Sequence, residues 1–579
     1  LEGQVDVPRP STGGDPSPIE LSAFYGPVAF HGSMLQGLTR VDAIGADFAR
    51  GSVATGNPAT WIPDSQRRAW VIDPLALDSA LQLSGLAAWV REGRAGTPIG
   101  IRRLAVLSAM PAGDVAAEVR FASRAAGSGA GADRWGGTLY LRDARGKMLL
   151  VAEDTAVELR RSAAAPALVL KPEWTNPALW PAVQDLKIRL EMAQAVGMRN
   201  PYFAVHDGTA RNTTVVAGRE LVNFSSYNYV GLSGDPRVVA ATCAAVERYG
   251  TSVSASRVAS GERAFHRDLE RELAAAQGAE DALVFTAGHA TNVTTIGHLF
   301  GKGDLILHDE LIHDSALQGI KLSGAARRSF RHDDPAHLEQ LLVELRGHHE
   351  KCLVVIEGVY SMDGDIPDLP AVLALKKKYG CLLMVDEAHS FGVIGATGRG
   401  IAEHFGIDGR EIDLWMGTLS KSLASCGGWI AGAEPVITYL RYTAPGFVYS
   451  AGLTAANGVA ALTALRLLLE EPWRVHRLQA NARIFWQALR DRGVDTGPAL
   501  GGSGVVPAVT GNSLWALQLS GRLLDLGVNV QPIVYPAVAD DAARLRFFLS
   551  STHTEEQLTS SAAKVADALA AVKAEFPMP

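Results

Sequence analysis

The chain has 579 residues, a net charge of −7 and 47% hydrophobic residues, a composition typical of a globular protein with more than one domain. The acidic balance disfavours nucleic acid as the main partner, and no apolar run reaches the length of a membrane span. The four cysteines show no CxxC spacing, so neither a metal site nor a disulfide framework is expected, and a reducing, cytoplasmic setting fits best.

Two stretches rich in proline and small residues predict linkers. The first is "VPRPSTGGDPSP" within residues 1–19, and the second is "RRSAAAPALVLKPEWTNPALWPA", which gives a linker at 161–182. They separate an expected first domain at 20–160 from a second at 183–579. Because the chain begins with Leu1 and not with methionine, we expect it to be a piece of a longer polypeptide.

The first domain combines strand-like runs with one helix. "AEVRFAS", "GGTLYLRD" and "KMLLVAEDTAVEL" have strand character, and apolar residues recur at helical spacing from Asp73 to Val90. One helix on an antiparallel sheet is an α+β arrangement.

The second domain alternates short, fully apolar runs with helical stretches. This pattern predicts a mostly parallel sheet covered on both faces, whose ligands bind at the carboxyl ends of the strands. The "DEAH" and "TLSK" segments both lie at such ends. The expected strands are 282–285, 305–308, 352–358, 381–387 and 413–420.

The polar groups at these strand ends match the needs of one cofactor. Lys421, which follows small polar residues, can form a Schiff base with an aldehyde. Asp386 can pair with a protonated pyridine nitrogen, and His389 can reach a phenolic oxygen, as at a pyridoxal phosphate site. "FTAGHATN" precedes a helical stretch, whose first N–H groups suit a phosphate. A solvated lysine and a tightly packed helix start are the ordinary readings of single features, but the combination favours the cofactor.

Residues 183–579 resemble the α-oxoamine synthases, which are fold-type I pyridoxal phosphate enzymes. That family includes 8-amino-7-oxononanoate synthase, glycine C-acetyltransferase, 5-aminolevulinate synthase and serine palmitoyltransferase. The resemblance implies a mostly parallel seven-stranded sheet and a small α+β C-terminal domain. It is carried, in order, by "NFSSYNYVGLSGDP", "YGTSVSASRVASGERAFHRDLERELA", "FTAGHATN", "DELIHDSALQG", "IEGVYSMDGD", "MVDEAHSFGVIG", "GTLSKSLAS", "FVYSAGLT" and "ARLRFFLSSTHT".

The resemblance implies four catalytic residues. Lys421 matches the lysine that bonds to the cofactor and moves the proton at the substrate α-carbon. Asp386 matches the partner of the pyridinium nitrogen, and His389 matches the ligand of the phenolic oxygen. His313 matches the histidine that stacks on the ring, with helix capping as the structural alternative.

Further cofactor contacts are also implied by the resemblance. Ser450 matches a phosphate contact supplied by the other subunit, which implies a homodimer with shared active sites, while Ala451 lacks a hydroxyl found in some members. The backbone and hydroxyl contacts within one subunit are Gly288, His289, Thr418, Ser420 and Ser361.

Two residues are expected to bind the substrate. Arg546 matches the guanidinium that holds the amino-acid carboxylate, for which a two-pronged donor is suited. Tyr227 stands where serine palmitoyltransferases carry tyrosine and most other members carry asparagine, although a packed core tyrosine is the alternative. The implied reaction joins a small amino acid (Ala, Ser or Gly) to an acyl thioester, with loss of CO2, to give an α-amino ketone.

The first domain resembles the second hot-dog half of polyketide or polyunsaturated-fatty-acid synthase dehydratases, through "FYGPVAFHGSMLQGL" and "WVIDPLALDSALQ". The usual "HGPxFQG" motif has Ser33 in place of proline. Asp78 matches the catalytic aspartate, with Gln82 four residues on, but the partner motif HxxxGxxxxP is missing. We therefore expect a scaffold or docking role, unless a first half stands in the longer parent chain.

A dehydratase-like domain joined to an oxoamine synthase in one chain favours an acyl thioester carried on an acyl carrier protein. The enzyme would then release a finished polyketide or fatty chain. Two alternatives remain. Another fold-type I reaction, such as transamination or decarboxylation, would use the same Asp386 and Lys421. A non-catalytic assembly-line module would need neither.

Overall fold

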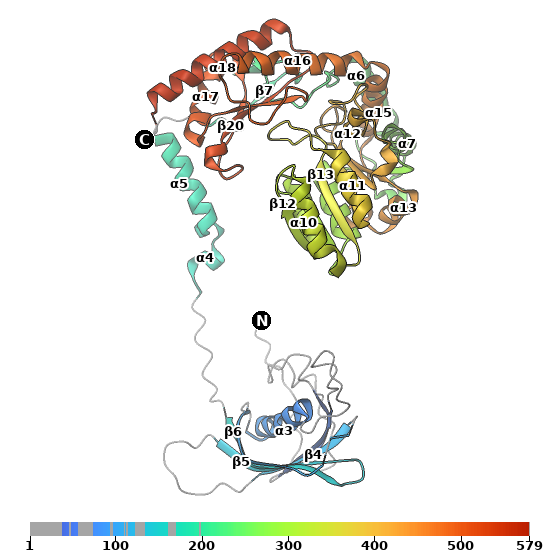
Figure 1. The fold of residues 1–579 in the computed structure, drawn as a ribbon, viewed down its shortest axis with the longest axis vertical. Coiled ribbons are helices and arrows are strands. Elements are labelled where there is room, and N and C mark those ends of the chain that lie inside the picture. The colour runs from blue at the N-terminus through green and yellow to red at the C-terminus, as the bar shows by residue number, and fades with distance from the viewer. Residues whose placement is uncertain are drawn as a thin grey trace. The chain divides into compact units, whose positions relative to one another are not determined.

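The computed structural model describes residues 37–45, 48–55, 73–92, 96–108, 110–111, 114–121, 134–159, 170–195 and 199–577. The chain divides into two compact units, Leu1–Asp185 and Leu186–Pro579 (Figure 1). The predicted linker 1–19 and the first part of the "HGSMLQG" motif lie outside the described residues. Within the described ranges, no helix has the length and apolar character needed to cross a membrane.

In the described residues of the first unit, a six-stranded antiparallel sheet packs against the helix α3, which lies on the sheet in Figure 1. The strand order is β1-β2-β4-β5-β6-β3. Ala76, Ala80 and Leu83 recur at helical spacing on α3 and are fully buried against the sheet. The predicted helix and the α+β hot-dog class are confirmed. The elements are β1 (Leu38–Ile44), β2 (Phe48–Ala54), α3 (Pro74–Glu92), β3 (Gly96–Val106), β4 (Asp114–Phe121), β5 (Arg134–Arg142) and β6 (Met148–Leu159).

The stretch predicted as the linker 161–182 is partly helical. It contains α4 (Pro172–Thr175), the 3-10 turn η2 (Pro177–Leu179) and the start of α5 (Pro181–Ala195). Each of these begins with a proline, which fits the first turn of a helix because no intrahelical bond is lost there. Pro172, Pro177 and Pro181, which indicated a loop, are thus helix starts.

The second unit is built on a seven-stranded sheet in the order β10-β16-β15-β14-β13-β11-β12. All pairs are parallel except those of β16, which runs antiparallel to β10 and β15. This confirms the predicted fold-type I sheet. The strands are β10 (Asp281–Phe285), β11 (Leu305–Asp309), β12 (Ala326–Phe330), β13 (Cys352–Glu357), β14 (Leu382–Asp386), β15 (Leu414–Thr418) and β16 (Gly428–Gly432).

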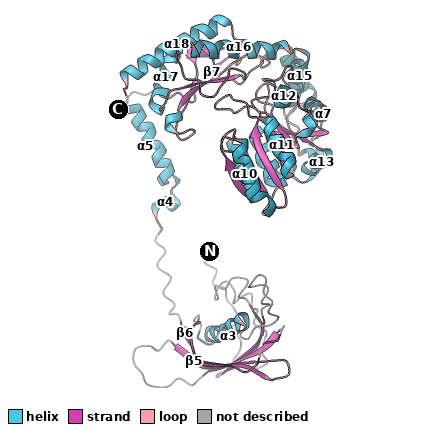
Figure 2. Cartoon of the chain, viewed as in Figure 1, coloured by secondary structure: helices cyan, strands magenta, loops and turns pink. Residues whose placement is uncertain are grey.

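Helices cover both faces of this sheet (Figure 2), and a separate apolar cluster forms on each face. Val354 and Ile356 of β13 join one cluster, whereas Leu353 and Val355 join the other. This division explains why the strands are continuously apolar. The helices are α6 (Pro236–Tyr249), α7 (Ala264–Gln277), α8 (Gly288–Leu299), α9 (Asp314–Ser323), α10 (Pro335–Leu345), α11 (Leu369–Tyr379), α12 (Ile401–Phe405), α13 (Glu434–Thr443), α14 (Pro445–Val448) and α15 (Ala455–Glu470), with short turns η3 (Arg257–Gly261), η4 (Arg346–His348) and η5 (Gly409–Glu411).

The small C-terminal domain brings both ends of this unit together. In the sheet β18-β9-β8-β7, the parallel pair of β18 with β9 joins residues far apart in the sequence, and a second sheet has the order β17-β20-β19. The backbone N–H of Phe548 in β20 donates to the carbonyl of Phe224, just before the Tyr227 segment. The elements are β7 (His206–Asp207), β8 (Thr213–Val216), β9 (Arg219–Asn223), α16 (Trp473–Arg490), β17 (Val505–Val509), α17 (Ser513–Asp525), β18 (Val528–Asn529), β19 (Gln531–Ile533), the turn η6 (Asp540–Ala542), β20 (Arg544–Phe548) and α18 (Glu555–Glu575).

Candidate active site

Asp386 is a buried carboxylate at the carboxyl end of β14. The residue is 6% exposed, and its oxygens accept hydrogen bonds from Asn292 Nδ2 and from the Ala388 N–H, both at 2.9 Å. Both donors are neutral. Because a buried carboxylate is stabilised by a cation that donates a hydrogen bond to it, the position is suited to a protonated nitrogen of a ligand.

Lys421 lies just past the end of β15, the strand that pairs with β14. Burial lowers the pKa of Lys421 to about 8, and the opposing attraction of Asp386 only partly offsets this effect. The ammonium nitrogen is 5.4 Å from the ring centre of Tyr227. A lysine with a lowered pKa is partly neutral near physiological pH and can attack a carbonyl carbon.

His389 is buried and held by a hydrogen bond of 2.8 Å between its Nδ1 and the Tyr229 hydroxyl. Burial, aided by the nearby charges of Lys421 and Arg546, keeps the pKa of His389 well below its usual range. The ring is therefore neutral. Since Tyr229 engages Nδ1, Nε2 is the nitrogen that can face a ligand.

His313 caps α9 and also belongs to the network around Asp386. Its Nδ1 lies 2.7 Å from Ser315 Oγ, and that hydroxyl accepts a hydrogen bond from Asn292 Nδ2 at 2.9 Å. Burial lowers the pKa of His313, although the Asp386 carboxylate opposes the shift. The capping alternative and a place beside Asp386 are therefore both realised.

The start of α8 forms a cradle with two hydroxyl groups. Gly288 and His289 are its first residues, and Ala287 before them provides no side-chain cap, so the N–H groups of the first turn have no acceptor within the helix. Thr418 Oγ1 lies 2.6 Å from Ser420 Oγ and would be 3.1 Å from a Cβ placed on Gly288. Free N–H groups, hydroxyls and a glycine at the closest approach suit a phosphate.

Arg546 is the central residue of β20. Its Nη1 donates to the Ser361 carbonyl at 3.0 Å, and the guanidinium lies 4.7 Å from the ring centre of Phe548. The buried Nε has no hydrogen-bond partner in the part of the chain that the structure describes. Ser361 is itself buried, and its N–H donates to Glu357 Oε2 at 3.3 Å. A guanidinium with an unused donor is suited to a carboxylate ligand.

Tyr227 is 40% exposed, so it is not a core tyrosine. Its ring packs edge-on against Phe548 at 4.7 Å and lies 6.0 Å from the His389 ring. With Ser420 and Lys421 it lines a cavity of about 360 Å³. The structure thus brings the predicted substrate residue to the predicted lysine.

Ser450 lies on a short segment after α14. Its hydroxyl donates to the Gly446 carbonyl at 2.7 Å, and the neighbouring Tyr449 is 86% exposed. Ser450 and Ala451 line a small cavity together with Phe285, the last residue of β10. A contact from Ser450 to a partner subunit stays a prediction.

In the first unit, Asp78 and Gln82 lie one turn apart on α3. Gln82 Nε2 donates to Asp78 Oδ2 at 2.6 Å. The spacing predicted from the DxxxQ motif is therefore a direct hydrogen bond.

Several residues of this site did not stand out in the sequence. Asn292 binds Asp386, Tyr229 binds His389 and Ser315 binds His313. All three lie inside motifs that carried the resemblance, but the partners of Asn292 and Tyr229 are 94 and 160 positions away in the sequence. His266, in the motif "YGTSVSASRVASGERAFHRDLERELA", has a structural role instead, since its fully buried ring forms a hydrogen bond of 2.7 Å with the Leu453 carbonyl.

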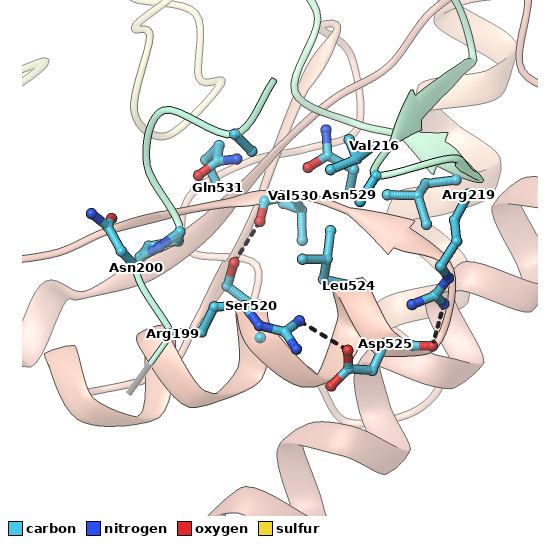
Figure 3. A pocket seen from close by; sticks show the side chains of 15 residues that line it. Arg199, Asn200, Val216, Arg219, Ser520, Leu524, Asp525, Asn529, Val530 and Gln531 are labelled. Atoms are coloured by element: carbon cyan, nitrogen blue, oxygen red, sulfur yellow. Dashed lines mark hydrogen bonds and ion pairs between the residues drawn. The ribbon is translucent and has the colours of Figure 1, made fainter. Parts of the chain in front are cut away.

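A second cavity of about 320 Å³ lies between the segment at 199–204 and α17 (Figure 3). Arg199 bonds to the Asp525 carboxylate at 2.9 Å, and Arg219 bonds to the Asp525 carbonyl at 2.9 Å. None of the predicted site residues lines this cavity.

The lysine, the buried carboxylate and the helix start fit the reactive aldehyde, ring nitrogen and phosphate of pyridoxal phosphate, as in the fold-type I class of enzymes. A family model described as "Aminotransferase class I and II" matches residues 219–565, and one described as "Polyketide synthase dehydratase N-terminal domain" matches residues 5–167. Which dehydratase half the first domain represents stays a prediction.

Similarity to known proteins shows which family of fold-type I enzymes the chain belongs to. 8-Amino-7-oxononanoate synthase of Symbiobacterium thermophilum is 39% identical over 356 residues, 62% of this chain and 90% of that protein. The structure of Sphingomonas wittichii serine palmitoyltransferase is 32% identical with a TM-score of 0.66, covering 68% of this chain and 99% of that one. A structure described as SPT with PLP is 31% identical with the same TM-score and coverage. The chain belongs to the pyridoxal phosphate-dependent α-oxoamine synthases.

Proposed function

We propose that this chain condenses a small amino acid (alanine, serine or glycine) with an acyl thioester on an acyl carrier protein. The amino acid loses CO2, and a polyketide or fatty chain is released as an α-amino ketone. The observation that carries this proposal is that Lys421, Arg546 and Tyr227 lie together: Tyr227 and Lys421 line one cavity, and Tyr227 and Arg546 both pack on Phe548. We assign Lys421 to proton transfer and Arg546 with Tyr227 to the substrate carboxylate.

Pyridoxal phosphate, when bound, supplies an electron sink for negative charge at the amino-acid α-carbon. We assign the phosphate to the start of α8 and to the hydroxyls of Thr418 and Ser420, with a further contact from Ser450 of the partner subunit. Asp386 would hold the ring nitrogen. The remaining ring contacts are assigned to His389, His313 and Ser361.

Lys421 is assigned to remove and return the proton at the substrate α-carbon. A pKa of about 8 lets the same amine accept and donate a proton near neutral pH. Arg546 is assigned to the substrate carboxylate. By fixing that group it sets the direction of the bond that breaks on loss of CO2, which is a positioning effect.

The fusion and the position of Tyr227 support the choice of acyl partner. A dehydratase-like domain precedes the synthase in the same chain, so an acyl group held on a carrier protein is a natural donor. Tyr227 lies at the cavity surface and not in the core, which supports a role in substrate contact and a long acyl chain. The dehydratase-like first domain, which carries Asp78 and Gln82, is assigned to carrier-protein docking or to a scaffold role.

The homodimer is supported by exposed aromatic side chains beside the Ser450 segment. Tyr439, Tyr442 and Tyr449 are all exposed in the single chain. Exposed aromatic groups of this kind are enriched at protein interfaces.

The test incubates the purified chain with pyridoxal phosphate, each of the three amino acids, and one acyl group on either a carrier protein or coenzyme A. Mass spectrometry identifies the product. We expect an α-amino ketone, formed faster from the carrier-bound donor. Formation of a keto acid without any thioester would favour an aminotransferase and overturn the proposal.

A further inference from the structure

His332 joins two loops of the large domain through its ring. Nδ1 lies 3.0 Å from Asp309 Oδ1, and Nε2 lies 2.7 Å from Asp365 Oδ2. The side chain is 20% exposed. Ionised carboxylates only accept hydrogen bonds, so both ring nitrogens must donate, and the ring is an imidazolium.

The backbone beside His332 strengthens the same junction. The His332 N–H donates to Glu310 Oε1 and the Asp333 N–H donates to Asp309 Oδ2, both at 2.9 Å. The Tyr360 ring stands edge-on to the imidazole at 4.5 Å. The segment after β12 is thus fixed to the end of β11 by side chain and main chain together.

The first loop leads to His313. Asp309 is the last residue of β11, and its Oδ1 also accepts the Leu311 N–H at 2.9 Å. His313 lies two residues after Leu311 and caps α9. The orientation of the Asp309 carboxylate therefore fixes the start of a short loop that ends at the predicted ring-stacking histidine.

The second loop leads to Arg546. The Tyr360 N–H donates to the Asp365 carbonyl at 3.0 Å, which closes the turn that contains Ser361. The Ser361 carbonyl accepts a hydrogen bond from Arg546 Nη1 at 3.0 Å. Asp363, in the same turn, forms an ion pair with Arg544 of β20. The turn therefore positions Arg546, the residue predicted to bind the substrate carboxylate, through the Ser361 carbonyl.

We propose that His332 is a positioning residue. Its contacts to Asp309 and Asp365, together called the His332 clamp, fix the positions of the loops that carry His313 and support Arg546. The inference rests on the proposed roles of these two residues. Burial opposes a charge on His332, but the hydrogen bonds to Asp309 and Asp365 prevail and raise its pKa to about 10. The His332 ring is therefore positively charged at neutral pH.

The test compares His332→Gln with His337→Gln. His337 lies five residues away on α10, and its Nδ1 accepts only the Arg331 N–H at 2.9 Å among the bonds recorded for its ring. Asp365→Asn is a second variant, which keeps the shape of the loop and removes one carboxylate charge. It remains informative if His332→Gln fails to fold.

Amide hydrogen exchange on the protein loaded with pyridoxal phosphate is the first readout. We expect His332→Gln and Asp365→Asn to speed exchange at 309–313 and 360–365 about tenfold, as for the loss of one charge-assisted hydrogen bond. His337→Gln should match the wild type there. Equal exchange in all variants, or a change spread evenly over the large domain, would overturn the proposal.

Binding supplies a readout that a purely structural role would not move. We expect both clamp variants to raise the dissociation constant for the amino acid about tenfold, followed by the absorption of the bound cofactor without any thioester. Unchanged amino-acid affinity would overturn the inference. If the wild type forms no ketone but these shifts occur, the proposed condensation fails while the positioning role stands.

Discussion

The two domains each carry an aspartate on a motif typical of catalysis, yet their surroundings differ. Asp386 lies in a network with Asn292, and its carboxylate acts electrostatically on Lys421 and on His313. Asp78 lies on a helix, where Gln82 one turn on donates to it at 2.6 Å. A catalytic motif therefore depends on groups from other segments: Asn292 and Lys421 come to Asp386 in the large domain, whereas the partner motif HxxxGxxxxP of the dehydratases is missing from this sequence.

Removal of Lys421 should have the largest effect on the condensation. We expect Lys421→Ala to lower ketone formation by at least about a thousandfold, because it removes both the cofactor attachment and the proton carrier. Product formation by mass spectrometry measures the loss. Asp78→Asn is the matched change in the other domain and should leave the condensation within about twofold, as for surface or scaffold positions. Equal losses in the two variants would contradict the division of roles.

Asp386→Asn tests the carboxylate itself with little change in shape. We expect kcat to fall about a hundredfold, the size of effect that follows loss of one partner from a buried charged pair. Retained pyridoxal phosphate absorption would show that the protein still folds and loads. A variant with wild-type kcat would contradict the role of Asp386.

Arg546→Lys separates binding from chemistry. Lysine keeps the charge but loses the two-pronged donor, so the KM for the amino acid should rise about tenfold or more, with a smaller change in kcat. Steady-state kinetics with each small amino acid provides the measurement. A fall in kcat with unchanged KM would place Arg546 elsewhere in the mechanism.

The pKa of Lys421, lowered to about 8, predicts a pH dependence for cofactor uptake. The neutral amine is the nucleophile, and its fraction grows as pH rises through 8. The rate at which the apoprotein takes up pyridoxal phosphate should therefore rise about fivefold to tenfold from pH 7 to pH 9 and then level off. A rate that keeps rising to pH 10.5 would indicate an unperturbed lysine.

Tyr227→Phe should have the smallest effect. It keeps the ring that lies over Lys421 and packs on Phe548 and removes only the hydroxyl. We expect a change in amino-acid KM of about threefold, the size of a single neutral hydrogen bond. Tyr227→Ala is the contrasting change, and an equal effect of the two variants would contradict a role for the ring.

The regular parts of the fold were predictable because their pattern is local. The apolar runs ending at Asp386 and Thr418 are strands β14 and β15, and the periodic stretch from Asp73 is α3. The linker at 161–182 stays a prediction, but its short helices were not predicted, because a proline at a helix start and a proline in a loop look alike in sequence.

The proximity of Asp386 and Lys421 was also predictable, since parallel strands bring their carboxyl ends to one edge, while their roles stay predictions. Their supporting partners were not. Asn292 reaches Asp386 across 94 positions and Tyr229 reaches His389 across 160. The His332 clamp likewise joins Asp309 and Asp365 from separate loops. Such contacts depend on the sheet order, which local patterns do not specify.

The fate of the amino-acid carboxyl group distinguishes decarboxylative condensation from the other reactions of this class of enzymes. Carboxyl-labelled alanine, serine or glycine is supplied with the chain, pyridoxal phosphate and an acyl carrier protein thioester. We expect labelled CO2 and unlabelled α-amino ketone in equal amounts, and no CO2 when the thioester is left out. Label retained in the product, or CO2 released at the same rate without a thioester, would contradict it.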